Sequence, residues 1–194
     1  MMAGRLLRGG VLCVVASLAA TAAAAQADDC MISLDAIAQP IPRFSDYPAP
    51  VEAIGRPAAP VLAGNREARR FASQIRDQAR TGPNFAGHLT VVGWGCGTAC
   101  LQWAVVDAKT GAVRFEPSIE VVTADRVSDA QAAAGDANQD FFMLRFRRDS
   151  RLMIVLGAPK EDEARGGAAF YEWTGASFKL VKFVPRKQAC RAGG

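Results

Sequence analysis

The residues best suited to chemistry lie in one short block, NFAGHLTVVGWGCGTAC, which runs from Asn84 to Cys100. The block contains the chain's only histidine, His88, and two cysteines, Cys96 and Cys100, that lie four residues apart. A thiol pair can exchange disulfides, a Cys–His pair can attack a substrate, and three such side chains can hold a tetrahedral metal. Alternatively, glycines around two close cysteines suit a disulfide that pins a turn between strands.

The cysteine pair fits a disulfide better than a reactive site. Thiol oxidoreductases use Cys-x-x-Cys at a helix N-terminus, whereas Cys96 and Cys100 are spaced more widely and a strand pattern follows them. No fourth metal ligand lies nearby in the sequence, and a disulfide sulfur cannot act as an attacking thiolate. We therefore predict a Cys96–Cys100 disulfide, no metal and no cofactor.

The residues around this pair form the first candidate contact surface. Gly95, Gly97 and Thr98 surround the predicted disulfide, and a pinned loop loses little entropy when it binds a partner. Trp94 would be a rigid aromatic anchor if its side chain is exposed, and the alternative is that it packs into the core. His88 belongs to the candidate surface, although a structural role at the start of a strand explains it better.

An arginine-rich hairpin is the second candidate surface. In FFMLRFR (141–147), alternation turns the apolar side chains inward and turns Arg145 and Arg147 outward. With two further arginines in the RDSR turn that follows, they can contact an acidic partner. A half-exposed sheet face would have the same pattern.

One stretch resembles the start of a calcium loop. Asp136, Asn138 and Asp140 have the opening spacing of an EF-hand, but Phe141 and Arg147 stand where glycine and the bidentate glutamate are required. A turn that leads into a strand explains these residues, so we predict no calcium site.

The N-terminus predicts export. Arg5 and Arg8 precede a short apolar run, and Ala25-Gln26-Ala27 is a small-x-small cleavage site, which together indicate a signal peptide over residues 1–27. We expect a periplasmic or secreted product without a lipid or membrane anchor. Loss of the two arginines lowers the formal net charge from +4 to +2 (4 − 2), which does not favour a nucleic-acid partner.

The remaining cysteines predict two disulfides. Four cysteines are left once Cys13 is removed with the leader, and an oxidising compartment pairs an even number of thiols. Three connectivities are possible. We prefer Cys96–Cys100 with Cys30–Cys190, because the first two are adjacent and the second two tie the chain ends together.

The hydrophobic pattern predicts a mainly β (α+β) fold. Residues 28–64 form a proline-rich N-terminal arm, with six of the chain's ten prolines between positions 39 and 60. Residues 65–194 form a single globular domain that begins with an amphipathic helix over 65–80, capped by Asn65. Seven or eight strands joined by short turns follow between residues 87 and 184, which predicts an antiparallel meander. The strands can form one curled sheet with the helix on its concave face, or two packed sheets.

Several motifs resemble a known group of proteins. NFAGH, the WGCGTxC pattern from Trp94 to Cys100, the VVDAKTG turn and the DSRL turn are similar to those of a family of uncharacterised exported bacterial proteins, over about Gly82 to Lys182. That family has no established activity, so the resemblance implies compartment and fold rather than chemistry. A weaker, architectural similarity is to the small periplasmic inhibitors of lysozyme, which are also disulfide-stapled antiparallel domains.

Two functional hypotheses follow. The first is a non-enzymatic, exported binding or inhibitor module whose partner, a periplasmic or secreted protein, contacts the loop around the cysteine pair or the arginine hairpin. The second is a periplasmic enzyme or thiol-redox protein that uses Cys96, Cys100 and His88. We favour the first, and the state of the two thiols distinguishes them.

Overall fold

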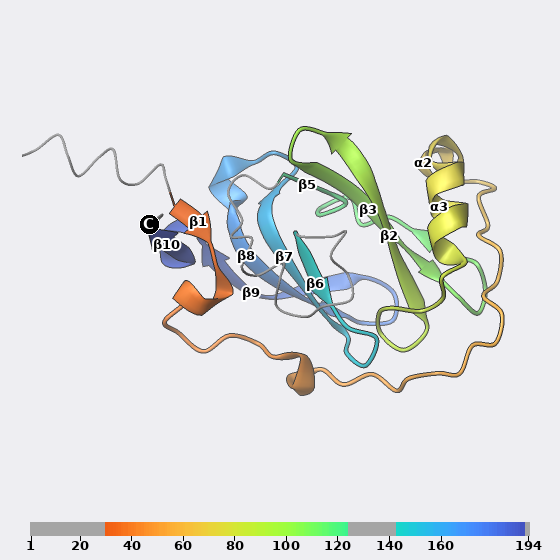
Figure 1. The fold of residues 1–194 in the computed structure, drawn as a ribbon, viewed down its shortest axis with the longest axis horizontal. Helices are drawn as coiled ribbons and strands as arrows, with labels where there is room; N and C mark the ends of the chain where they lie inside the picture. Colours follow the sequence, from red (N-terminus) through yellow and green to blue (C-terminus); the bar gives the residue numbers. More distant parts are fainter. Residues whose placement is uncertain (1–29, 124–142, 193–194) are drawn as a thin grey trace, which may run out of the picture.

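A computed structural model describes residues 30–123 and 143–192 of the chain (Figure 1). The predicted signal peptide and the stretch Asp136 to Asp140 lie outside these residues. Within the described ranges, no helix has the length and apolar character that crossing a membrane requires.

The described core is an open, eight-stranded antiparallel sheet, which confirms the predicted mainly β fold. Six strands follow one another in the order β2-β3-β5-β7-β8-β9, while β4 pairs with β3 and β6 pairs with β7. The strands are β2 (Leu89–Gly97), β3 (Cys100–Asp107), β4 (Val113–Arg114), β5 (Val121–Thr123), β6 (Leu144–Phe146), β7 (Leu152–Pro159), β8 (Gly167–Trp173) and β9 (Phe178–Pro185). Neighbours in space are mostly neighbours in sequence, as short connections require.

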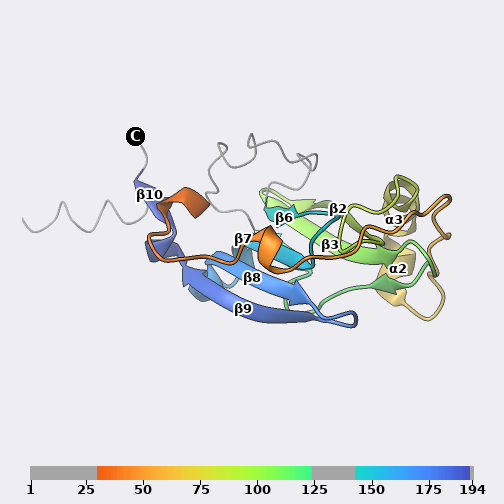
Figure 2. The ribbon, with the colours of Figure 1, turned by 90° about the horizontal axis from the view of Figure 1, so that it is seen from below.

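The sheet curls so that strands far apart in its order face each other. Trp103 on β3 and Phe178 on β9 have ring centroids 5.5 Å apart, and Phe178 also packs on Trp173 of β8 and stacks on Phe85. The main hydrophobic core therefore lies inside the curl, between β2–β3 and β7–β8–β9 (Figure 2). Of the two arrangements left open by the sequence, one curled sheet is the observed one.

Two short helices cover the outer face of β2 and β3. They are α2 (Arg66–Arg70) and α3 (Ala72–Ala79), so the single helix predicted over 65–80 is interrupted at Phe71. The predicted cap is present, because the Asn65 side chain accepts a hydrogen bond from the Ala68 backbone N–H at 3.0 Å. Ile75 and Ala79 pack in a second hydrophobic cluster, on the face opposite Trp103, so the placement of the helix on the concave face is wrong.

The proline-rich arm runs along the molecule from the end of β9 to the helices (Figures 1 and 2). It begins with β1 (Cys30–Ile32), which pairs antiparallel with β10 (Cys190–Ala192), and it includes the 3-10 turns η1 (Leu34–Ala36) and η2 (Phe44–Asp46). Two further 3-10 turns, η4 (Glu163–Arg165) and η5 (Arg186–Gln188), flank β8 and β9. Cys190 is disulfide-bonded. The Cys30–Cys190 connectivity remains a prediction, which peptide mapping without reduction tests.

Candidate functional site

The stapled tip is the turn of the β2–β3 hairpin, residues 95–99. Cys96 and Cys100 form a disulfide with their Cα atoms 5.1 Å apart, as predicted. The strand register shifts between Gly95 and Gly97, and Gly97 then pairs with Cys100. Residues 95–99 are all exposed, so this turn stands free of the core, and the Cys96–Cys100 disulfide closes it covalently.

Trp94 supports the tip from the inside and is not part of its surface. Its side chain is only 8% exposed. The indole stacks on Phe71 with centroids 4.5 Å apart, meets the Phe115 ring edge-on at 6.2 Å, and donates a hydrogen bond to the Gln102 side chain. Of the two alternatives that the sequence left open for Trp94, packing into the interior is the observed one.

His88 lies at the opposite end of β2 from the cysteines. It is eight positions before Cys96 along extended chain, which corresponds to about 26 Å at the rise per residue of a strand. Within the described ranges, no group of three or more His, Cys, Asp or Glu side chains could hold a metal ion. The structure therefore does not bring His88, Cys96 and Cys100 into one site, whether metal or nucleophilic.

His88 instead takes part in an ionic cluster with the N-terminal arm. Its Nδ1 lies 2.8 Å from Oε1 of Glu52, an arm residue, and its Nε2 lies 3.9 Å from Asp107. Lys109 Nζ lies 3.0 Å from Oε2 of the same glutamate. The hydrogen bond from Lys109, together with the nearby His88, lowers the pKa of Glu52 below its ordinary value. The cluster joins the arm to the turns before β2 and after β3.

Glycines in these two turns let the arm approach closely. A Cβ at Gly87, whose φ is +83°, would lie 2.2 Å from the carbonyl oxygen of Pro50. A Cβ at Gly111, whose φ is +77°, would lie 2.1 Å from the carbonyl oxygen of Ala59. A residue with a side chain is disfavoured at both positions, because its Cβ would clash with the carbonyl oxygen and because the positive φ angle is strained for it. The NFAGH and DAKTG turns thus form part of the surface on which the arm packs.

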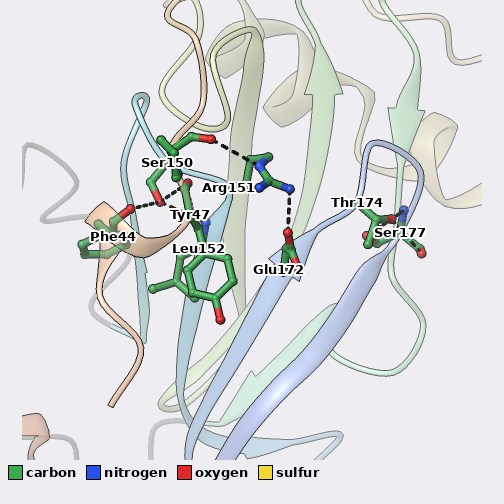
Figure 3. Close-up of polar contacts among 9 residues, drawn as sticks. Phe44, Tyr47, Ser150, Arg151, Leu152, Glu172, Thr174 and Ser177 are labelled. Atoms are coloured by element: carbon green, nitrogen blue, oxygen red, sulfur yellow. Dashed lines mark hydrogen bonds and ion pairs between the residues drawn. The ribbon is translucent and has the colours of Figure 1, made fainter. Parts of the chain in front are cut away.

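The RDSR turn holds the same arm nearer its N-terminal end, at residues 44–48 (Figure 3). Ser150 is fully buried, and its hydroxyl donates to the carbonyl oxygens of Phe44 and Tyr47 at 2.9 Å each. Arg151 Nε donates to the carbonyl oxygen of Pro48, and its guanidinium pairs with the Glu172 carboxylate. These contacts bind a proline-rich segment that has few backbone donors of its own.

The two arginines proposed as outward binding residues differ in environment. Arg145 is 7% exposed, so its outward orientation is wrong: all three residues of β6 are buried, because both faces of this short strand are covered. Its Nη1 donates to the carbonyl oxygen of Leu144. Arg147 is exposed, but it makes two 2.9 Å hydrogen bonds to Asp149, which lower the pKa of that carboxyl group, and it lies over the Phe44 ring. Neither guanidinium is simply presented to an acidic partner.

Sequence reasoning missed two features of this site. One is the ionic cluster around Glu52, since a single glutamate in a proline- and alanine-rich arm gives no sign of its distant partners. The other is the set of contacts by which the NFAGH, DAKTG and RDSR turns hold the arm. A glycine in each of two turns was the available signal, but its cause, the approaching carbonyl, is visible only in three dimensions.

Comparison with known proteins adds no relative: no family model, curated protein or solved structure matches this chain. The resemblance to a family of exported bacterial proteins stays a prediction.

Proposed function

We propose that the chain is an exported, non-enzymatic binding module that presents its stapled tip, residues 95–99, to a protein partner. One observation carries the proposal: the tip is exposed and covalently fixed, whereas other residues of the same sequence block serve the fold. Trp94 packs under the helices, and Gly87 and His88 hold the arm. The tip is the part of the block that is exposed and packs in neither hydrophobic cluster.

The chemistry of the tip suits recognition of a polar, groove-shaped surface. Gly95 and Gly97 are exposed and carry no side chains, so a partner can approach the backbone of the tip closely. The disulfide and the packed Trp94 beneath it restrict the loop before binding, which reduces the entropy that binding must overcome. A predicted signal peptide and the disulfide both support a periplasmic or secreted setting.

Two features favour binding over the redox or enzymatic alternative. The cysteines are bonded to each other in a hairpin turn, and among the described residues neither of them lies at a helix N-terminus, which would stabilise a thiolate. His88, the base that such an enzyme would need, lies at the far end of the strand and pairs with Glu52. Labelling of Cys96 and Cys100 by a thiol reagent in the native protein would revive the alternative.

The test is affinity capture from periplasmic extract with the mature protein as bait. Thr98→Arg places a long cation on the exposed tip, and Ala176→Arg makes the matched change on the exposed turn between β8 and β9. We expect quantitative mass spectrometry to find a protein that wild type and Ala176→Arg enrich and that Thr98→Arg loses. Equal enrichment by all three baits, or no specific enrichment by any, would contradict the proposal.

A further inference from the structure

A groove of about 530 Å³ lies between the N-terminal arm and α3. Its arm side is formed by Pro57, Ala58, Ala59 and Pro60, and its helix side includes Ala79. The volume lies within the range of small-molecule sites, which combine apolar walls with a few placed polar groups. The arm here contacts the turn that follows β3, so the groove and the stapled tip lie at opposite ends of the β2–β3 hairpin.

Among the described residues, three arginines and no carboxylate line this groove. Arg76 of α3 and Arg80, the C-cap residue of that helix, are four residues apart and so lie on the same side of it, and Arg56 comes from the arm. Arg80 also meets Asp77 at 3.3 Å, but both side chains are highly exposed, and such surface pairs contribute little. Among the described residues, the side chains of Arg56 and Arg76 make no hydrogen bond or ion pair. The helix dipole stabilises positive charges near a helix C-terminus, which accounts for the positions of Arg76 and Arg80 but not for that of Arg56 in the arm.

The apolar wall is held in place before any ligand binds. Ala58 N–H donates to the Ala108 carbonyl oxygen and Val61 N–H donates to the Gly111 carbonyl oxygen, both at 2.8 Å. Proline restricts the φ angle at Pro57. A wall fixed in this way needs little ordering on binding.

We propose that this groove binds a small organic anion that carries two or more negative charges on an apolar body. A guanidinium group forms paired hydrogen bonds with a carboxylate or a phosphate, and three of them can neutralise a ligand of more than one charge. A single inorganic anion would leave most of the groove unfilled, so the apolar body lies against the proline and alanine wall. This site is independent of the protein partner proposed for the stapled tip.

Nuclear magnetic resonance titration of the mature protein tests the inference with four probes. Isophthalate and phenyl phosphate carry acidic groups on a ring, inorganic phosphate has no apolar body, and benzamide has no charge. We expect saturable shifts of the Ala58 and Ala79 amide resonances with the first two at millimolar concentrations, weaker binding of inorganic phosphate, and no binding of benzamide. Comparison of the affinities for the two ring anions shows whether the groove prefers a carboxylate or a phosphate ligand.

Paired variants separate a specific site from general attraction. Arg76→Gln should weaken binding of the ring anions about tenfold or more, as expected for loss of one charge-assisted contact. Arg69→Gln removes the same charge from α2, outside the groove lining, and should leave the affinity nearly unchanged. Equal weakening by both variants, or no saturable shift with either ring anion, would overturn the proposal.

Discussion

Gly111→Ala tests how closely the N-terminal arm is seated on the turn after β3. An added Cβ would lie 2.1 Å from the carbonyl oxygen and 3.1 Å from the carbonyl carbon of Ala59. Both contacts are with backbone, so no side-chain rotation relieves them. The methyl group fits only if the arm moves away from the turn.

Gly64 provides a control that separates this clash from backbone strain. Its φ is +77°, the same as that of Gly111, but nothing lies within 4 Å of the position of its Cβ. Alanine in the left-handed region costs about 1–2 kcal/mol at either site. At Gly111 the displaced arm also loses the hydrogen bonds of Ala58 and Val61 to this turn, at about 1 kcal/mol each. We expect Gly111→Ala to lower the free energy of unfolding by about 3–4 kcal/mol, compared with about 1–2 kcal/mol for Gly64→Ala.

Chemical denaturation of the protein under non-reducing conditions measures both losses. Limited proteolysis gives a local readout, because a displaced arm should be cut faster between residues 50 and 60 in Gly111→Ala than in Gly64→Ala. Equal destabilisation of the two variants, with equal rates of arm cleavage, would refute the account of the arm as a closely seated element.

Three further predictions concern the staple, the support beneath it and the ionic cluster. Replacing Cys96 and Cys100 together by serine should cost about 2 kcal/mol of unfolding free energy, the chain-entropy value for so short a loop, and denaturation with unchanged stability would contradict a structural staple. Trp94→Ala should cost about 3–5 kcal/mol, and a loss under 1 kcal/mol would contradict its buried, stacked position. The hydrogen bond from Lys109 lowers the pKa of Glu52 in the folded state. The negative charge of Glu52 therefore stabilises the fold at pH values above the ordinary carboxyl pKa, and this stabilisation disappears as the pH falls through the lowered pKa. Glu52→Gln should therefore be destabilising near neutral pH and neutral in strong acid, and a pH-independent effect in thermal unfolding would contradict this.

Local patterns predicted much of the fold. Alternation in the segment that became β3, with short turns between strands, was enough for an antiparallel sheet. Asn65 was recognised as a cap because its bond to Ala68 spans only three residues. The Cys96–Cys100 disulfide was predictable for the same reason, since both partners belong to one turn.

Features that depend on distant partners were not predictable. Arg145 alternates like a solvent-facing residue, but its strand is covered on both faces. The side of the sheet that the helices cover depends on how the sheet curls, and that is decided by contacts such as Trp103 with Phe178. The position of the arm depends on the contact between Glu52 and His88, and no periodicity in either segment predicts that contact.

Site-specific photo-cross-linking from the stapled tip tests the central claim most directly. A photoreactive residue at Thr98, in otherwise native protein within the cells that make it, should give a discrete adduct with a partner protein, and the same residue at Ala176 should not. The adduct should be lost when the disulfide is removed by substitution of both cysteines, because the tip is then no longer held in place. Absence of any adduct at Thr98, or identical adducts from both positions, would contradict the claim that the tip is the binding surface.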